Sequence, residues 1–201
     1  LVTRYHMYQQ VYFHKVNMLT QAYLVNMLER ARTLAEAGAL QLSPELEHML
    51  LNDALSPEEY VLLNDAHVKV ALPGWAKHED ARLAGYAQRL LSRKGFHKSL
   101  RIEPLTIEMC EIVMPRIAEA LSEHGYDVEL DLIQATIRKR GYLPYNGGIL
   151  LEDERDASEH SALIRSLAQP NERCLIFVPE DVRDEMAVSY THLTLPTTGS
   201  V

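Results

Sequence analysis

Three side chains near the start of the chain combine residue types that can hold a phosphorylated sugar. Arg4, Tyr8 and Tyr12 follow one another at intervals of four residues, a spacing that places them on one face of a helix. A guanidinium offers a fixed fork of donors to phosphate oxygens, and a tyrosine can pack its ring on a sugar while its hydroxyl bonds a sugar hydroxyl. Aromatic residues at helical spacing are also typical of a buried core, so both interpretations stay open at this point.

A second group with phosphate-binding chemistry is the basic run Arg138-Lys139-Arg140. It precedes a glycine-bearing loop over 141–148, and basic residues before such a loop can hold phosphate or RNA. Basic residues are also favoured at the C-terminal end of a helix. The ordinary interpretation of this run is therefore a charged helix end.

The elements that must position these residues are mostly helices. Apolar spacing, Ser-Pro-Glu starts and glycine stops predict helices over 4–37, 44–53, 57–71, 75–93, 106–124, 131–139 and 157–168. Pro73-Gly74 is expected to break the chain between two of them. Short strands are expected over 99–103, 127–130, 149–151 and 174–178. The sequence thus predicts a mainly α fold, helical over 1–100 and α+β over 101–187.

Both ends of the chain carry signals of their own. The chain starts with Leu1, inside a helical pattern and without Met, which favours a start within a longer protein. The stretch 188–197 resembles the translation of an adapter used in preparing sequencing libraries. Residues 188–201 are therefore expected to be a non-native tail and are left out of the fold prediction.

Composition narrows the classes of partner. The 28 acidic residues exceed the 20 basic ones, for a net charge of −8, and broad nucleic-acid binding needs the opposite balance. The sequence contains no run of about 18 apolar residues, so no membrane span is expected. Cys110 and Cys174 lie in apolar surroundings without metal-ligand spacing, so we expect buried free thiols and a cytoplasmic protein.

The stretch from Thr3 to Lys15 resembles the helix that follows the last metal ligand in HD-superfamily phosphohydrolases of the deoxynucleoside-triphosphatase type. The resemblance implies that Arg4 contacts the triphosphate and that Tyr12 lies against the deoxyribose. Tyr8 stands where some relatives carry His. His14 and Lys15 match a His-Lys pair that, in the vertebrate member, faces a regulatory nucleotide site between subunits.

Two later segments extend the resemblance over about residues 1–105. Leu62-Leu63-Asn64-Asp65 is similar to a Leu-x-Asp segment of the family. The stretch 93–98 is similar to its Arg-Lys-Leu-Phe-Lys segment, with Gly95 in place of Leu. By this resemblance Arg93 joins the regulatory phosphate site, and residues 1–100 are the C-terminal helices of an HD domain.

The family's metal site needs a His, a His-Asp pair and a later Asp, and this sequence contains no His-Asp dipeptide. His78-Glu79-Asp80 is the nearest cluster, but consecutive helical residues point in different directions. We therefore expect no catalytic residue and no metal ligand in this chain, and a fragment without hydrolytic activity. The resemblance implies a longer protein that uses a divalent metal to convert a dNTP to deoxynucleoside and triphosphate.

The same resemblance implies a homo-oligomer that binds nucleotide. Two other functions stay open. The chain fits a non-enzymatic, nucleotide-responsive assembly or regulatory module, because 106–187 carries no catalytic constellation. It also fits an RNA-binding piece acting through 138–148, which the net negative charge disfavours.

Overall fold

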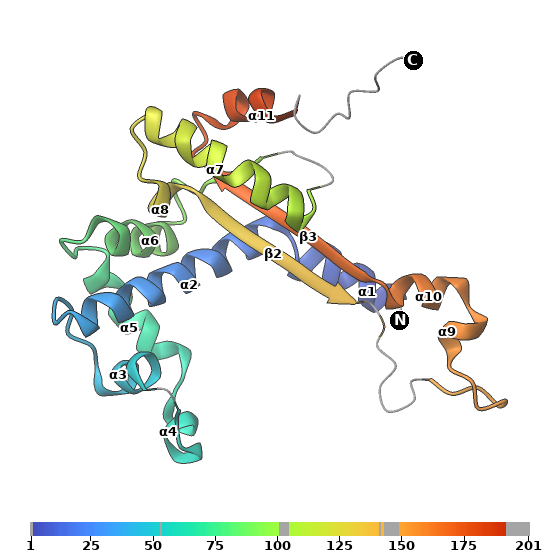
Figure 1. The fold of residues 1–201 in the computed structure, drawn as a ribbon. Coiled ribbons are helices and arrows are strands. Elements are labelled where there is room, and N and C mark those ends of the chain that lie inside the picture. Colours follow the sequence, from blue (N-terminus) through green and yellow to red (C-terminus); the bar gives the residue numbers. More distant parts are fainter. Residues whose placement is uncertain (1, 53, 101–104, 141, 143–148, 192–201) are drawn as a thin grey trace.

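The computed structural model describes residues 2–52, 54–100, 105–140, 142 and 149–191. Within these ranges the chain is mainly α-helical with one small three-stranded antiparallel sheet (Figure 1), which confirms the predicted fold class. No helix among the described residues is both long and apolar enough to cross a membrane.

The first part of the chain consists of helices. Their bounds are α1 Val2–Met7, the π-helix η1 Tyr8–Tyr12, α2 Lys15–Glu36, α3 Pro44–Leu51, α4 Pro57–Leu62, α5 Asp65–Trp75 and α6 Ala81–Ser92. Side-chain caps start most of them, as when Ser43 accepts a hydrogen bond from the backbone of Leu46. At the start of α4, Ser56 and Glu59 form a reciprocal capping box.

The second part adds the sheet and its covering helices. The bounds are β1 Lys98–Ser99, α7 Ile107–Glu123, α8 Val128–Asp131, β2 Ile133–Arg140, α9 Ala157–His160, α10 Ala162–Ala168, β3 Pro170–Val178 and α11 Arg183–Thr191. The strand order is β1-β3-β2. β2 pairs along its whole length with β3, from Ile133 opposite Phe177 to Arg140 opposite Pro170. They form a ribbon whose far end carries α9 and α10 (Figure 1).

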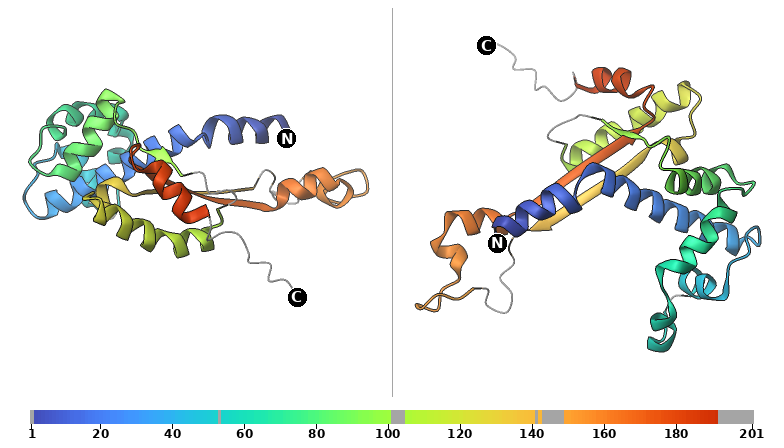
Figure 2. Two further views of the ribbon diagram at one scale, coloured as in Figure 1. Left: turned by 90° about the horizontal axis from the view of Figure 1, so that it is seen from above. Right: turned by 180° about the vertical axis from the view of Figure 1, so that it is seen from behind.

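The pleat of β3 divides its side chains between two cores. Leu175 and Phe177 pack with α2, whereas Cys174, Ile176 and Val178 pack with α7, because successive strand residues point to opposite faces. Figure 2 shows α7 on one face of the ribbon and α1, η1 and α2 on the other. The core around α2 includes residues from both sides of position 100, and the predicted domain boundary there stays a prediction.

Several predicted elements are confirmed by the structure. The helix predicted over 44–53 is α3, and that over 106–124 is α7, which Thr106 caps through the backbone of Met109. The strand predicted over 174–178 is the second half of β3. The helix predicted over 157–168 is present as α9 and α10, with Ser161 between them.

Three helix boundaries were predicted wrongly. The helix expected over 4–37 is interrupted at Phe13 and His14, where the backbone of His14 is extended. The helix expected over 57–71 is divided at Leu63 and Asn64, because the Asn64 side chain caps α5. The expected break at Pro73-Gly74 is absent: α5 runs on to Trp75, whose burial at 4% exposure holds the last turn against the core.

The secondary structure around residue 130 was also predicted wrongly. Residues 128–131 form the short helix α8, capped by Asp127, in place of a strand. The segment predicted as a helix over 131–139 is strand β2. Its buried residues Ile133, Ala135 and Ile137 alternate with exposed ones, which is the period of a half-buried strand. Arg138 therefore lies near the end of a strand, not at a helix C-terminus.

The expectation of free thiols is wrong as well, because Cys110 and Cys174 are joined by a disulfide with their Cα atoms 6.3 Å apart. The helix α7 lies on β3 and brings the two sulfurs together inside the core. Residues 149–151 form only an isolated bridge between Leu150 and Asp156. Most of the predicted strand 99–103 and of the loop 141–148, and residues 192–201 of the predicted tail, lie outside the described residues.

Candidate functional site

Arg4, Tyr8 and Tyr12 lie together on one face of α1 and η1. The guanidinium carbon of Arg4 is 5.6 Å from the centre of the Tyr8 ring, and the Tyr8 and Tyr12 ring centres are 4.8 Å apart. Tyr12 is 53% exposed and Arg4 is also exposed, while Tyr8 is partly buried. The group is therefore an open surface of one cation and two neighbouring, mutually tilted rings, not a sealed part of the core.

The backbone beneath this group is a π-helix, which the sequence did not reveal. Phe13 donates its amide to the carbonyl of Tyr8 at 2.9 Å, a bond that spans five residues. Single-turn π segments are rare and occur frequently at functional sites. The turn ends where His14 adopts an extended backbone and accepts a hydrogen bond from Val16 through Nδ1, which starts α2.

The predicted regulatory residues separate into two sets. Lys15 and Arg93 line one cavity of about 280 Å³. His14 does not line this cavity, because its side chain caps α2. Two further cations that sequence reasoning did not assign, Lys98 and Arg183, also line it. The N-terminus of α2 adds the positive end of a helix dipole at Lys15 and Val16.

The cations of this cavity are partly neutralised by neighbouring carboxylates. Lys98 lies 3.2 Å from Glu180, and Arg183 pairs with Asp184. Phe96 and Phe177 supply apolar wall. The arrangement suits an anion that carries a flat apolar group, and its cations come from separate segments: Lys15 from α2, Arg93 from the end of α6, Lys98 from β1 and Arg183 from α11.

The 93–98 turn has an unusual backbone. Arg93 ends α6 in the left-handed region with φ of 54°, and Gly95 follows with φ of 65°. The left-handed region is open to glycine but disfavoured for a residue with a Cβ. The turn is fixed from within by Tyr23 of α2, which is fully buried.

Tyr23 and His97 are joined by two hydrogen bonds. The Tyr23 hydroxyl accepts from the His97 backbone amide at 2.9 Å and lies 2.5 Å from Nδ1 of the His97 ring. Nε2 of the same ring is 3.2 Å from Asp131 of α8. Because a carboxylate can only accept, Nε2 carries the hydrogen and Nδ1 accepts from Tyr23. Burial raises the pKa of Tyr23 to about 12 and lowers that of His97.

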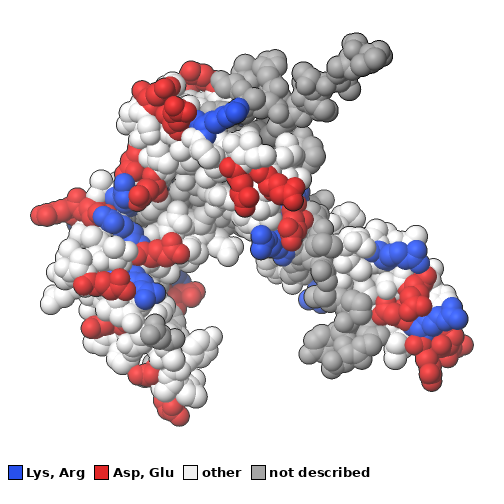
Figure 3. Space-filling model, viewed as in Figure 1, with Lys and Arg blue, Asp and Glu red and all other residues white. Residues whose placement is uncertain are grey.

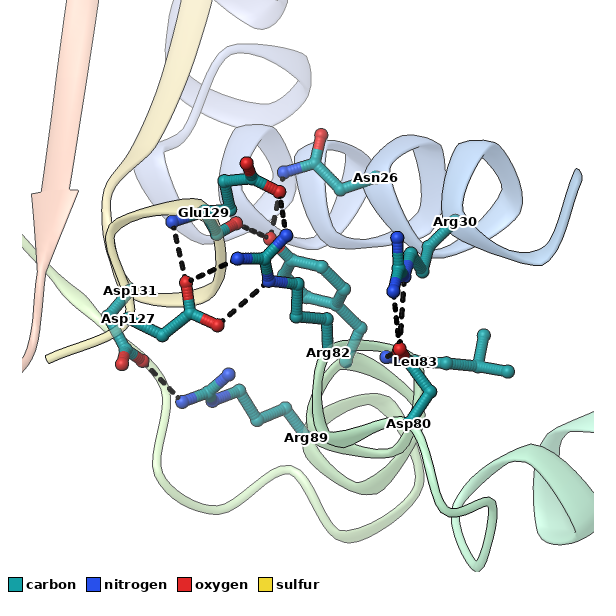
Figure 4. Close-up of polar contacts among 10 residues, drawn as sticks. Asn26, Arg30, Asp80, Arg82, Leu83, Arg89, Asp127, Glu129 and Asp131 are labelled. Atoms are coloured by element: carbon teal, nitrogen blue, oxygen red, sulfur yellow. Dashed lines mark hydrogen bonds and ion pairs between the residues drawn. The ribbon is translucent and has the colours of Figure 1, made fainter. Parts of the chain in front are cut away.

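Ion pairs join α2, α6 and α8 beside this network (Figure 4). Arg30 donates to Asp80, with Nε at 3.1 Å from Oδ1. Arg82 contacts both Asp127 and Glu129, and Arg89 reaches Asp131 at 2.9 Å. Hydrogen bonding from Arg30 lowers the pKa of Asp80 to about 2. Each of these arginines has a carboxylate partner, which makes the cluster structural.

No group of three or more His, Cys, Asp or Glu residues in the described part of the chain is arranged to hold a metal ion. His78 contacts the carbonyl of Ala39, and Asp80 caps α6 and binds Arg30. Both residues are therefore occupied by structural contacts. The described residues do not fit the metal site that the family resemblance implies.

The basic run at 138–140 lies on β2. Arg138 is exposed and its Nε is 3.9 Å from Glu172 on β3, so a carboxylate faces it across the ribbon. On the face drawn in Figure 3, red carboxylates and blue basic groups are interspersed over the described residues, without a broad basic area. RNA binding through 138–148 stays an untested prediction.

A larger cavity, of about 840 Å³, lies between α3 and α5. It is lined mainly by apolar side chains, including Leu40, Leu42, Val70 and Trp75. None of the residues predicted to bind nucleotide lines it. Volume alone does not make it the functional site, because Arg4, Tyr8 and Tyr12 and the cations around Lys15 lie elsewhere.

Comparison with known proteins shows similarities in both sequence and structure. The chain is 31% identical over 97 residues to an uncharacterized protein, YwfO, of Bacillus subtilis, over 48% of this chain and 22% of YwfO. Its structure is similar to that of a phosphohydrolase from Bacteroides thetaiotaomicron, with a TM-score of 0.63 and 25% identity, over 89% of this chain and 48% of that one.

A hypothetical protein from Aquifex aeolicus has a similar fold, with a TM-score of 0.55 and 24% identity, over 93% of this chain and 42% of that one. No family model matches the chain. The chain therefore spans less than half the length of each of these proteins.

Proposed function

We propose that this chain carries the nucleotide-holding part of a phosphohydrolase of the HD superfamily that acts on deoxynucleoside triphosphates. The observation that carries the proposal is the group formed by Arg4 of α1 with Tyr8 and Tyr12 of the π-helix η1, where Arg4 and Tyr12 are exposed. Similarity to a phosphohydrolase structure supports the reaction class. Arg4 would bind phosphate oxygens, Tyr12 the deoxyribose, and Tyr8 would hold the two in line.

The reaction would be catalysed by a longer protein that contains this chain, and it would release triphosphate and the deoxynucleoside. The divalent metal of such enzymes neutralises phosphate charge and readies water. The described residues of this chain do not supply its ligands. The contribution of this chain would be positioning, since holding a reactant in place lowers the barrier by removing its freedom of motion.

Binding of dGTP to the chain, followed by calorimetry, tests the proposal. We expect Arg4→Ala to raise Kd about tenfold, the size of one charge-assisted phosphate contact, and Tyr12→Ala to weaken binding as well. Arg32→Ala is the matched control, because Arg32 forms an i,i+4 pair with Glu36 on the exposed side of α2. Equal affinity of the Arg4→Ala and Arg32→Ala variants would contradict the proposal.

Hydrolysis is a separate question from binding. We expect no release of triphosphate when the purified chain is incubated with dGTP and Mg²⁺ or Mn²⁺. Metal-dependent release of triphosphate that co-purifies with the chain would show that the chain itself carries the catalytic residues. That result would overturn the expectation that these residues lie outside the chain.

A second candidate is a nucleotide-responsive assembly module, and the cavity lined by Lys15, Arg93, Lys98 and Arg183 favours it. A phosphate-bearing ligand there would relieve repulsion among these cations and favour a homo-oligomer. Light scattering after size exclusion, with and without dGTP, tests the idea. We expect dGTP to raise the mass of the wild-type chain but not that of a Lys15→Ala/Arg93→Ala variant. An unchanged wild-type mass would reject this candidate.

A further inference from the structure

The helical segment that carries the Arg4–Tyr12 group has few anchors of its own. None of the residues of α1 or η1 is fully buried. Met7, Val11 and Tyr12 are exposed large apolar side chains. Beyond η1, the chain is tied by Asn17, whose amide donates to the carbonyl of Val11 at 2.6 Å. A contact from elsewhere in the fold must fix how the segment is rotated about its axis.

Strand β3 supplies such a contact. Leu175 and Phe177 point to the α2 side of the sheet, and the two-residue period of a strand points Arg173 to the same side. The Arg173 guanidinium donates to Oε1 of Gln9, which lies in η1 between Tyr8 and Tyr12. The rear view in Figure 2 shows α1 running along the ribbon formed by β2 and β3.

The hydrogen bond from Arg173 determines the orientation of the Gln9 side-chain amide. Its oxygen accepts from Arg173, while its nitrogen is shielded from solvent and has no hydrogen-bond partner among the described residues. A buried donor without a partner is unfavourable. Gln9 keeps this orientation because the opposite one would place its amide hydrogens against the guanidinium, which has donors only.

We propose that Arg173 is a positioning residue for the nucleotide-binding face. By holding Gln9, it sets the rotation of η1 and thereby the direction of the Tyr8 and Tyr12 rings. This inference rests on the proposed function. It gives the C-terminal region a role, because β3 supports the nucleotide-binding helix through Arg173, which lies 164 residues after Gln9 in the chain. The same strand carries the disulfide to α7.

A double-mutant cycle on the full 201-residue chain tests the inference, with dGTP affinity and hydrogen exchange of the backbone amides of 8–13 as readouts. Arg173→Met keeps the aliphatic stem but removes the donors. We expect it to raise Kd about fivefold, the size of one lost hydrogen bond, and to speed exchange in η1. Gln9→Leu should behave alike, and the double variant should be no worse than either single one.

Exchanging the partners separates this role from general destabilisation. The Arg173→Gln/Gln9→Arg variant places the guanidinium on η1 and the amide on β3, and we expect its affinity to return to within about twofold of wild type. Arg116→Met, on the exposed side of α7, is the control for losing an arginine.

The possible outcomes divide cleanly between the two proposals. Wild-type affinity and wild-type exchange in Arg173→Met would overturn the positioning role and leave the proposed function standing. A swapped variant that binds no better than Arg173→Met would also overturn the role. A wild-type chain that does not bind dGTP would overturn the proposed function, and with it the positioning role.

Discussion

At the scale of single residues, the hydroxyl of Tyr23 connects α2 to His97 through two hydrogen bonds. It is the acceptor for the His97 backbone and the donor to the His97 ring, within a fully buried site. The groups that face the ring are Tyr23, Asp131 and Arg89. Addition of a second proton to His97 would turn Nδ1 from an acceptor into a donor. The Tyr23 hydroxyl hydrogen would then lose its acceptor in a site that solvent does not reach.

The lowered pKa of His97 in the folded chain leads us to predict that the free energy of unfolding depends on pH. Burial lowers the pKa of His97 in the folded chain, whereas the unfolded chain keeps a value near 6.5. Below about pH 6.5 the unfolded state therefore binds more protons, and the free energy of unfolding falls as pH falls toward the folded pKa. The loss is at most about 1.4 kcal/mol per pH unit from this one group.

Urea unfolding at pH values from 7.5 to 5.5 measures this effect. We expect the wild-type chain to lose stability relative to His97→Gln as pH falls, because the variant has no titrating ring. His48→Gln, at an exposed position of α3, is the control. A constant difference between wild type and His97→Gln across this range would refute the prediction.

At the scale of the elements, Asp80 joins two helices. Its side chain caps α6 by accepting from Leu83 and also binds Arg30 of α2 (Figure 4). The short segment between α5 and α6 is thereby fixed against the long central helix. The pKa of Asp80 in the folded chain is about 2, mainly because of the hydrogen bond from Arg30. The stabilisation by this carboxylate is therefore complete above about pH 3.9, near its pKa in the unfolded chain, and is lost as the pH falls toward 2.

Two substitutions separate the cap from the ion pair. Asp80→Ala removes both and should cost about 1–2 kcal/mol for the cap alone, with the loss of the Arg30 contact in addition. Asp80→Ser keeps a capping oxygen and should recover most of the cap contribution. Urea unfolding near pH 7 gives both values. Equal destabilisation by the two variants would show that the cap contributes nothing.

At the scale of the whole molecule, one strand connects the two cores. β3 packs Leu175 and Phe177 on α2 and packs Cys174, Ile176 and Val178 on α7. The disulfide between Cys110 and Cys174 closes a loop with a sequence separation of 64. The helical first part and the α+β second part therefore share the strand that also reaches η1.

The disulfide predicts a redox-dependent stability. Chain entropy assigns a loop of this length a contribution of about 4 kcal/mol, so unfolding in urea should shift to lower concentration when a reductant is present. A Cys110→Ala/Cys174→Ala variant should show no such shift. Thiol titration of the denatured chain checks the bond directly: two free thiols before reduction would contradict it.

Local signals in the sequence predicted the helix starts and the shared face of Arg4, Tyr8 and Tyr12. Ser43, Ser56 and Thr106 each cap the helix that their position indicated, because a cap depends on residues within three positions of it. The face of Arg4, Tyr8 and Tyr12 follows from spacing alone and survives the change from α-helix to π-helix.

The tertiary structure alone determined the features that form when segments distant in the sequence come together. Residues 133–140 are a strand because β3 pairs with them and α2 buries one side of them. Lys98 and Arg183 meet Lys15 and Arg93 at one cavity, and Arg173 meets Gln9, only once the ribbon lies on the N-terminal helices. Spacing determines which side chains share a face, whereas long-range burial determines which faces meet.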